Sequence, residues 1–438
     1  MQRAGLRPRG RRLFCPWRRS LACKSRSLLP FATSLGVFCG YFFSDLPQRA
    51  RGRREHTLMR IIGLILGLAV ILSVLLDAFE TVVLPRRINR QFRLTAWFYR
   101  RTWIPWRRLA ARITAPARRE AFLGYFGPLS LIFLLAFWAT GLIVGFALMQ
   151  YGAGKHVRLS NEPISFGILL YHSGETFFTL GYGDIVPASG PARALAVVEA
   201  GMGFAFLGVV IGYLPTIYGA FSRREIEISL LDARAGSPPT AAELLARFGN
   251  CPSQTVLDQI FSDWERWSAE VLESHLSYPV LSFFRSQHNN QSWLGALTAI
   301  LDATSLVIAG VSDLRPEQAK ITFAAARHAV VDLAQVVNAR YNPALAERLS
   351  AEELTRVREM LLERKLQMRE GPEFEQKLMH LRSLYEPYVQ AMAGNLLVTL
   401  PPWIHKEKRR DNWQAGPWDK FIQARKPSPR IAIIDDHF

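Results

Sequence analysis

Six consecutive residues in the middle of the chain, Thr179-Leu180-Gly181-Tyr182-Gly183-Asp184, could bind a cation through backbone oxygens. Gly181 and Gly183 flank one aromatic residue, and glycine adopts backbone dihedral angles that residues with a Cβ resist. Several such segments around one axis could direct their carbonyl oxygens inward and replace the water molecules around a dehydrated cation. The Thr179 hydroxyl would add an oxygen at the inner mouth. The chemistry that this stretch indicates is cation coordination.

This string resembles the selectivity filter of the potassium channel family, in which the loop reads Thr-Val-Gly-Tyr-Gly. Leu180 stands where that loop has valine, which implies slightly different packing behind the filter with selectivity kept. A Gly-Tyr-Gly alone would be a weak signal, because a glycine turn between two membrane helices could also contain it. Here a short apolar segment precedes the string and a long one follows it. The resemblance, to two-transmembrane-type potassium channels, covers residues 121–222. It implies ion binding by Thr179, Leu180, Gly181, Tyr182 and Gly183, the first four as K⁺ ligands.

The segments on both sides of the string have lengths that suit a pore module. Residues 123–150 contain no charge, and a helix of 28 residues extends about 42 Å, enough to cross a bilayer with tilt. Residues 163–178 are too short to cross, so they must re-enter the membrane as a helix whose C-terminal dipole end favours a cation. We therefore expect an outer helix at 123–150, a pore helix at 163–178, the filter at 179–184 and an inner helix at 190–221.

Three acidic residues near the filter are candidates for supporting it. Glu175 precedes Thr179 by four residues and Asp184 follows the filter, and the resemblance implies a hydrogen bond between the two carboxyl groups as a brace. One of the two would then be protonated, because two close carboxylates cannot easily both ionise. The alternative places Glu175 in a water pocket. Glu199 lies inside an apolar segment, where an acid is costly. It either bonds the pore helix or lines the cavity and concentrates cations.

Glycines along the expected inner helix have two interpretations. The resemblance places a gating hinge near the middle of this helix, where Gly203 or Gly201 is the best match. Small residues also permit close helix packing, which explains Gly208 and Gly212 better. Pro215 provides a second point at which the helix could kink.

The positive charge of the chain is concentrated before the pore module. The formal net charge is +18, and residues 1–58 hold 13 Lys/Arg against two acids. Residues 85–120 hold 11 Lys/Arg against one acid, and the remainder is slightly acidic, which argues against a nucleic-acid-binding domain. Residues 59–84 form a further apolar segment of spanning length. Its basic C-terminal flank should be cytoplasmic by the positive-inside rule.

The arginines before residue 59 conflict with that orientation. A chain that begins at Met1 would carry Arg49, Arg51, Arg53 and Arg54 across the membrane. We therefore interpret residues 1–58 as a basic extension that is not part of the mature or true protein. A genuine basic arm is the alternative.

The basic loop at 85–120 interleaves arginines with aromatic residues between residues 90 and 115. This composition suits an interfacial segment on anionic lipid, with a plain basic loop as the alternative. Asp77 and Glu80, at the inner end of the first span, are expected to pair with Arg86 or Arg87.

The C-terminal half lacks a recognisable catalytic or cofactor motif. A linker at 223–239 ends in Gly-Ser-Pro-Pro, a helical cytoplasmic domain follows at 240–405, and a basic tail occupies 406–438. Apolar residues recur at helical spacing, and prolines separate the segments. No glycine-rich nucleotide motif follows a strand, no Cys/His spacing suits a metal, and no nucleophile and base pattern appears, so an enzyme is disfavoured. The expected helices are 241–248, 253–274, 292–309, 316–339, 344–369 and 372–392.

Together these patterns predict an all-α membrane protein with a pore-loop cation channel module, an extra N-terminal span and a helical cytoplasmic domain. The resemblance implies a homotetrameric potassium-selective channel for passive transport in the cell (plasma or inner) membrane, without a cofactor other than the permeant K⁺. No apolar span carries regularly spaced arginines, so voltage sensing is not expected. The expected partners are membrane lipid and, for the C-terminal domain, an unknown ligand or protein, but no nucleic acid. The alternatives are a non-selective cation channel and a membrane-anchored sensor or scaffold with a vestigial pore.

Overall fold

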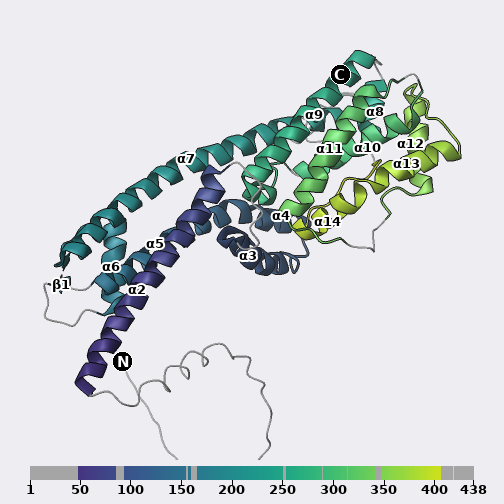
Figure 1. Ribbon diagram of the computed structural model, residues 1–438. Coiled ribbons are helices and arrows are strands. Elements are labelled where there is room, and N and C mark those ends of the chain that lie inside the picture. Colours follow the sequence, from purple (N-terminus) through teal and green to yellow (C-terminus); the bar gives the residue numbers. More distant parts are fainter. Residues whose placement is uncertain are drawn as a thin grey trace, which may run out of the picture. The chain divides into compact units, whose positions relative to one another are not determined.

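A computed structural model describes most of the chain (Figure 1). The described residues are 48–84, 93–153, 156–158, 165–249, 253–288, 290–312, 314–341, 347–405 and 418. The chain divides into two units, residues 1–58 and 59–438. The predictions for residues 1–47, for Arg86 and Arg87, and for nearly all of the basic tail lie outside the described residues.

Three long apolar helices in the described residues can cross a membrane: α2 (Gln48–Ala78), α5 (Phe126–Ala153) and α7 (Gly190–Ala235). Their most apolar windows are only 28%, 50% and 11% buried within the chain, so most of their apolar surface is left for lipid or for other chains. Helix α10 (Trp293–Gly310) is also long and apolar enough, but 94% of its window is buried by the rest of the chain. The predicted class, an all-α membrane protein, is confirmed.

The bounds of the outer helix and of the inner helix differ from the prediction. The outer segment consists of α4 (Pro116–Gly124) and α5, rather than one helix at 123–150. The inner helix does not end at residue 221, and α7 continues through most of the predicted linker to Ala235. The physical reason is that its apolar spacing continues beyond the membrane segment. Ile228, Leu231 and Ala235 lie on one face at helical spacing and are fully covered by the C-terminal domain.

Helices α2 and α5 approach each other closely along small residues. A Cβ on Gly67 would lie 2.5 Å from the carbonyl oxygen of Gly145, and one on Gly145 would lie 2.6 Å from Ile71 Cγ1. Small residues allow two membrane helices to come within reach of backbone contact, which favours association in lipid. Figure 1 shows α2 beside α5 along this contact.

The pore helix is α6 (Phe166–Phe177), slightly shorter than the predicted 163–178. Ser165 caps its first turn by accepting a hydrogen bond from the Ile168 amide. The sequence pattern did not indicate the short antiparallel pair of β1 (His156–Arg158) and β2 (Ile185–Pro187). In this pair Val157 lies opposite Val186. Strand β2 directly follows the filter.

Two further elements, one before the pore module and one within the C-terminal domain, contribute to a shared aromatic cluster. Helix α3 (Leu94–Ala110) carries aromatic side chains that contact α5, with Phe98 and Phe137 ring centroids 5.7 Å apart. A short turn, η2 (Pro279–Phe283), reaches the same place from the C-terminal domain. Trp103 of α3 packs against Phe283 at 5.0 Å, so the C-terminal domain and the membrane helices share one aromatic cluster.

The C-terminal domain is helical around the buried helix α10. Four predicted segments, 241–248, 253–274, 292–309 and 316–339, agree with helices in type and approximate bounds. The segment 344–369 forms a shorter helix, and 372–392 divides into two helices because Pro387 starts the second one. The helices are α8 (Ala241–Gly249), α9 (Gln254–Ser277), α10, α11 (Glu317–Val336), α12 (Ala351–Glu363), α13 (Pro372–Ser383) and α14 (Glu386–Leu396).

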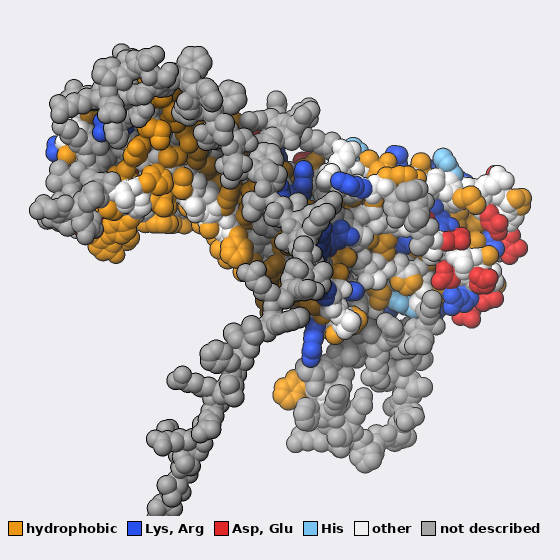
Figure 2. Space-filling view, turned by 90° about the horizontal axis from the view of Figure 1, so that it is seen from below, with side chains coloured by type: hydrophobic (Ala, Val, Ile, Leu, Met, Phe, Trp, Pro, Cys, Tyr) orange, Lys and Arg blue, Asp and Glu red, His pale blue; other side chains and the backbone are white. Residues whose placement is uncertain are grey.

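The charge distribution differs between the two parts of the surface. Figure 2 shows hydrophobic side chains over the membrane helices, and Asp and Glu gathered at the end of the molecule where α12 and α13 lie in Figure 1. This distribution is typical of a domain in water attached to helices in lipid.

A buried ionic network joins α10 to the segment before α12 and to the start of α14. Arg348 makes a two-pronged contact with Asp302, with Nη2 at 2.7 Å from Oδ2 and Nη1 at 3.1 Å from Oδ1. The Tyr385 hydroxyl donates to Asp302 Oδ1 at 2.5 Å, and Glu386 lies 3.3 Å from Arg348. Asp302 has no exposed surface. Each charge is therefore satisfied by hydrogen bonds, as a buried ion requires.

Replacing Arg348 with glutamine should destabilise the C-terminal domain by about 3–5 kcal/mol, because it leaves the Asp302 carboxylate buried without its cation. Denaturation of the purified protein, followed by circular dichroism, measures this change. Arg356→Gln is the matched control, since Arg356 pairs with Glu353 at 3.9 Å on the surface. An exposed pair contributes less than about 1 kcal/mol. Equal effects of the two substitutions would contradict the importance of the buried network.

Candidate functional site

The filter backbone alternates between left-handed and right-handed conformations. Thr179, Gly181 and Gly183 have φ angles of 56°, 63° and 75°, whereas Leu180 and Tyr182 have negative φ. In an extended strand, successive peptide planes face opposite sides. The alternation in the sign of φ therefore departs from a regular strand along residues 179–183. Glycine adopts a positive φ without strain, but Thr179 does so at a cost, which is typical of functional segments.

The filter is exposed in the single chain. Leu180 and Tyr182 have 57% and 70% of their surface exposed. Thr179, Gly181 and Gly183 are exposed as well. Backbone carbonyls inside a membrane need partners, because lipid offers none. The five residues predicted to hold a cation therefore form an exposed wall of the described chain.

The last turn of the pore helix holds the beginning of the filter. The Thr179 amide donates to the Thr176 carbonyl at 3.1 Å, and the Leu180 amide donates to the Glu175 carbonyl at 2.8 Å. The chain thus passes from helix to filter without a loop. The C-terminal end of the pore-helix dipole consequently lies at the start of the filter, where it favours a cation.

The expected brace between Glu175 and Asp184 is not formed in the described chain. Glu175 is buried, and its Oε1 lies 3.2 Å from His172 Nδ1. His172 precedes it by one helical turn on the same face of α6, so it is closer than a residue beyond the filter. Asp184 instead lies within electrostatic reach of Tyr171. The two carboxyl groups thus interact with different residues of the pore helix.

Glu199 links α7 to the pore helix. Its carboxylate accepts a hydrogen bond from the Ser173 hydroxyl, which also lies 2.7 Å from the Ile143 carbonyl of α5. Gln150 of α5 contacts the same carboxylate. Glu199 has no exposed surface. Of its two predicted roles, the bond to the pore helix is what the structure contains, and a cavity-lining acid does not fit a side chain without exposure.

The glycines of α7 differ in what surrounds them. A Cβ on Gly203 would lie 1.8 Å from the Phe177 carbonyl oxygen, so α7 touches the end of the pore helix at this residue. Gly201, Gly208 and Gly212 have nothing within 4 Å of the same position in the described chain. The packing role expected for Gly208 and Gly212 therefore does not occur within one chain. Helix α7 is continuous through all four glycines and through Pro215.

Arg224 fastens the inner helix to the C-terminal domain. It is buried, and its guanidinium donates to the carbonyls of Leu281 at 2.9 Å and Phe284 at 3.0 Å. The Trp267 indole donates to the Arg224 carbonyl at 3.3 Å. The guanidinium also pairs with the adjacent Glu225 at 2.9 Å. The partners Trp267, Leu281 and Phe284 lie 43 to 60 residues further along the chain, so no local pattern could have identified them.

His275 belongs to the same contact. Arg224 Nη1 lies 3.3 Å from His275 Nε2, and His275 Nδ1 lies 2.8 Å from the Val271 carbonyl. Arginine can only donate, so His275 must be neutral with its proton on Nδ1. Burial, and then the nearby Arg224 charge, lower the pKa of His275 to about 3.

Asp77 positions α3, a role that the sequence did not reveal. Its carboxylate accepts hydrogen bonds from the Thr95 amide at 3.1 Å and hydroxyl at 2.6 Å, and from the Trp138 indole at 2.9 Å. The bonds lie at the N-terminus of α3, where a negative charge is favoured. Asp77 thereby joins α2, α3 and α5. Its expected partners Arg86 and Arg87 lie outside the described residues.

Comparison with known proteins supports an ion-channel domain. Residues 132–218 match the family model described as "Ion channel". The chain is 24% identical over 195 residues to the "Uncharacterized membrane protein YdjJ" of Bacillus subtilis (strain 168), an alignment that covers 44% of this chain and 55% of that protein. The chain thus spans about half the length of that relative. No solved structure matches the chain. The resemblance to the two-transmembrane channel family is confirmed for the segment that carries α6, the filter and most of α5 and α7.

Replacing Gly203 with alanine should destabilise the pore module by about 1–3 kcal/mol, because the new methyl group overlaps the Phe177 carbonyl. Gly201→Ala is the matched control on the same helix, where the added methyl group meets no atom within 4 Å. Alanine favours a helix over glycine by about 0.5–1 kcal/mol, so the control should be neutral or stabilising. Thermal unfolding in detergent measures both. Equal tolerance of the two substitutions would refute the contact.

Acid should weaken the contact at the end of the inner helix. The folded-state pKa of His275, about 3, lies below its ordinary value near 6.5, so the unfolded chain binds the proton more strongly between these values. The contribution of neutral His275 to the free energy of unfolding is fully present above about pH 6.5. It falls by about 1.4 kcal/mol per pH unit as the pH decreases toward 3. Unfolding at pH 7 and pH 5, compared between wild type and His275→Gln, measures this slope. An unchanged slope in the variant would contradict it.

Proposed function

We propose that this chain is one subunit of a homotetrameric, potassium-selective channel that conducts K⁺ passively through the filter at Thr179–Asp184. The observation that carries the proposal is the backbone of residues 179–183, in which φ alternates in sign along the filter string. A dehydrated K⁺ needs several oxygens around it, and four copies of this wall would supply them. The match of residues 132–218 to an ion-channel model supports the same conclusion.

The exposed surface of α7 supports assembly with other copies of the chain. Val197, Phe204 and Ile211 have 74%, 74% and 64% of their surface exposed, and Tyr218 continues the same spacing at 47%. Residues seven apart lie nearly on one face of a helix, so these side chains form a continuous apolar stripe. The stripe runs along the inner helix. A tetramer would place it against the neighbouring subunits or along the pore.

The positions of the basic residues support a cytoplasmic C-terminal domain in a cell membrane. Helices α3 and α4 carry Arg100, Arg101, Arg107, Arg108, Arg118 and Arg119 between the first span and α5. Short basic loops remain on the cytoplasmic side. The inner end of α7 faces the same side, because α5 and α7 are separated by a re-entrant segment. We propose no enzymatic activity and no cofactor other than the permeant ion.

The two alternatives make different predictions for ion flux. A non-selective cation channel would need the filter or Glu199 to alter selectivity, but the Glu199 side chain is fully buried and bonded to Ser173 of the pore helix. A membrane-anchored scaffold with a vestigial pore would keep its assembly without conducting ions. Flux measurements separate all three.

Liposomes that contain the full chain should show K⁺ flux well above Na⁺ flux. Tyr182→Ala should abolish the preference for K⁺ or the flux itself, because it removes the aromatic side chain between the two filter glycines. Tyr125→Ala is the matched control, since Tyr125 is similarly exposed, at 64%, but lies between α4 and α5. It should conduct as the wild type does.

Three outcomes decide the proposal. Selective flux that only Tyr182→Ala removes supports the potassium channel. Equal flux of both ions in the wild type favours the non-selective channel. A tetramer without any flux, identified by native mass spectrometry, favours the scaffold.

A further inference from the structure

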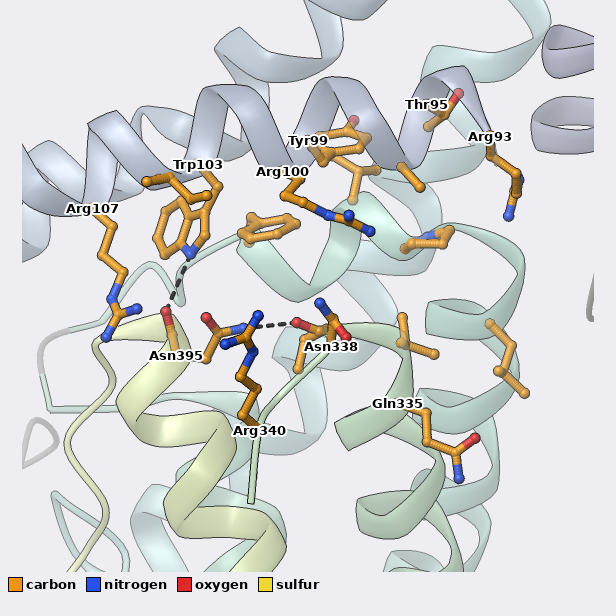
Figure 3. A pocket seen from close by; sticks show the side chains of 18 of the residues that line it. Arg93, Thr95, Tyr99, Arg100, Trp103, Arg107, Gln335, Asn338, Arg340 and Asn395 are labelled. Atoms are coloured by element: carbon orange, nitrogen blue, oxygen red, sulfur yellow. Dashed lines mark hydrogen bonds between the residues drawn. The ribbon is translucent and has the colours of Figure 1, made fainter. Parts of the chain in front are cut away.

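A cavity of about 920 Å³ lies where α3, α7 and the C-terminal domain meet. We call it the junction cavity. One wall is the face of α3 that carries Arg93, Arg100 and Arg107 (Figure 3). The opposite wall is formed by the ends of α11 and α14, with Asn338, Arg340 and Asn395. Its size is within the range of cavities that hold small organic ligands.

The junction cavity carries an excess of positive charge. Four arginines line it, and Asp332 is the one acid among its described lining residues. Arg93 lies 3.8 Å from Glu80, and Arg107 donates to the Gly394 carbonyl at 2.9 Å. Like charges that face one another across a cavity repel, and an anion between them removes that repulsion.

Arg100 and Arg340 are the two cations available to a ligand. Neither has a hydrogen bond or ion pair within the described part of the chain, and both belong to the cavity lining. Figure 3 shows Arg100 reaching from α3 and Arg340 reaching from the opposite wall into the space between them. Guanidinium groups bind phosphate oxygens in pairs of parallel hydrogen bonds. Two of them on opposite walls suit a phosphate group.

The walls around these arginines are ordered. Trp103 donates to the Asn395 carbonyl at 3.2 Å, and the Asn395 side chain donates to the Val337 carbonyl at 2.7 Å. These bonds connect α3 to α14 and α14 to α11. The spacing between the two arginine-bearing walls is therefore fixed by hydrogen bonds, which reduces the entropy that a ligand must overcome.

The floor of the junction cavity is apolar. Leu134, Tyr213, Val280 and Phe283 line it. Tyr99 stacks on Phe283 with ring centroids 5.7 Å apart and planes 11° apart. A free inorganic ion would leave this floor uncovered, whereas a ligand with an apolar or aromatic body would cover it.

We propose that the junction cavity binds a phosphate-bearing anion with an apolar or aromatic body, held by Arg100 and Arg340. Two sources share this chemistry: an anionic phospholipid from the adjoining bilayer and a soluble organic phosphate. Binding of this anion does not depend on the proposed channel function. An effect on K⁺ flux does rest on the proposed function. Since Tyr213 of the inner helix lines the cavity, we expect a bound anion to change that flux.

The experiment measures binding directly, with two arms that distinguish the sources. In the first arm, the full chain in neutral detergent is titrated with ATP, and separately with inorganic phosphate, by calorimetry. In the second, the chain is reconstituted in phosphatidylcholine nanodiscs with or without phosphatidylglycerol, and retained lipid is counted by native mass spectrometry. Saturable binding in either arm supports the proposal and identifies the source.

Matched variants locate the site. Arg100→Gln and Arg340→Gln should each weaken binding at least about tenfold, because each removes one charge-assisted hydrogen-bond donor. Arg108→Gln is the control, since Arg108 is exposed on the same helix but does not line the cavity. It should bind as the wild type does. Unfolding midpoints of all three variants confirm that they are folded.

Two results would overturn the proposal. One is the absence of saturable binding of ATP and of phosphatidylglycerol. The other is an equal loss in Arg108→Gln, which would show that general surface charge attracts the anion. Binding without an effect on flux would leave the junction cavity as a ligand site and would count against its regulatory role alone.

Discussion

The contact between α7 and the last turn of the pore helix is the constraint on which the filter geometry depends. At Gly203 the two backbones are so close that a single added methyl group would overlap the Phe177 carbonyl. One turn earlier on α7, Glu199 binds Ser173 of the same pore helix. The filter begins directly after this turn. Its position is therefore set by a backbone contact and a buried hydrogen bond, which together resist both sliding and rotation of α7.

The same helix carries this constraint out of the membrane. Helix α7 continues without a break to Ala235, and its last turns form part of the core of the C-terminal domain. Arg224 adds hydrogen bonds to the carbonyls of Leu281 and Phe284. The domain and the filter are thus attached to opposite ends of one rigid element. A change in the position of the domain has to be absorbed by bending of α7 or by movement at Gly203.

The sequence was sufficient for the features that have a local signature. The filter string, the membrane helices and most C-terminal helices follow from motif, apolar length and helical spacing. The misplaced end of α7 came from treating the membrane boundary as a helix boundary, although Ile228 and Leu231 continue the apolar face. The partners of Asp77 and the carbonyl partners of Arg224 could not be predicted, because they depend on which residues the tertiary fold brings together. The partner of Glu175, in contrast, is His172 on the same helix, one turn earlier. An acid inside an apolar segment was a clear signal at Glu199, but the sequence left two roles open, and only the fold shows the bond to Ser173.

The position of α3 explains why the arginines at its surface can face the C-terminal domain without pairing. Asp77 binds the N-terminus of α3, and Trp103 binds the end of α14, so the helix is held at two points along its length. A helix held in this way keeps Arg100 and Arg107 among the residues that line the junction cavity. Arg100 both lines the junction cavity and is exposed to water, so an anion can reach it from solvent. An anion between Arg100 and Arg340 would reduce the repulsion between these like charges.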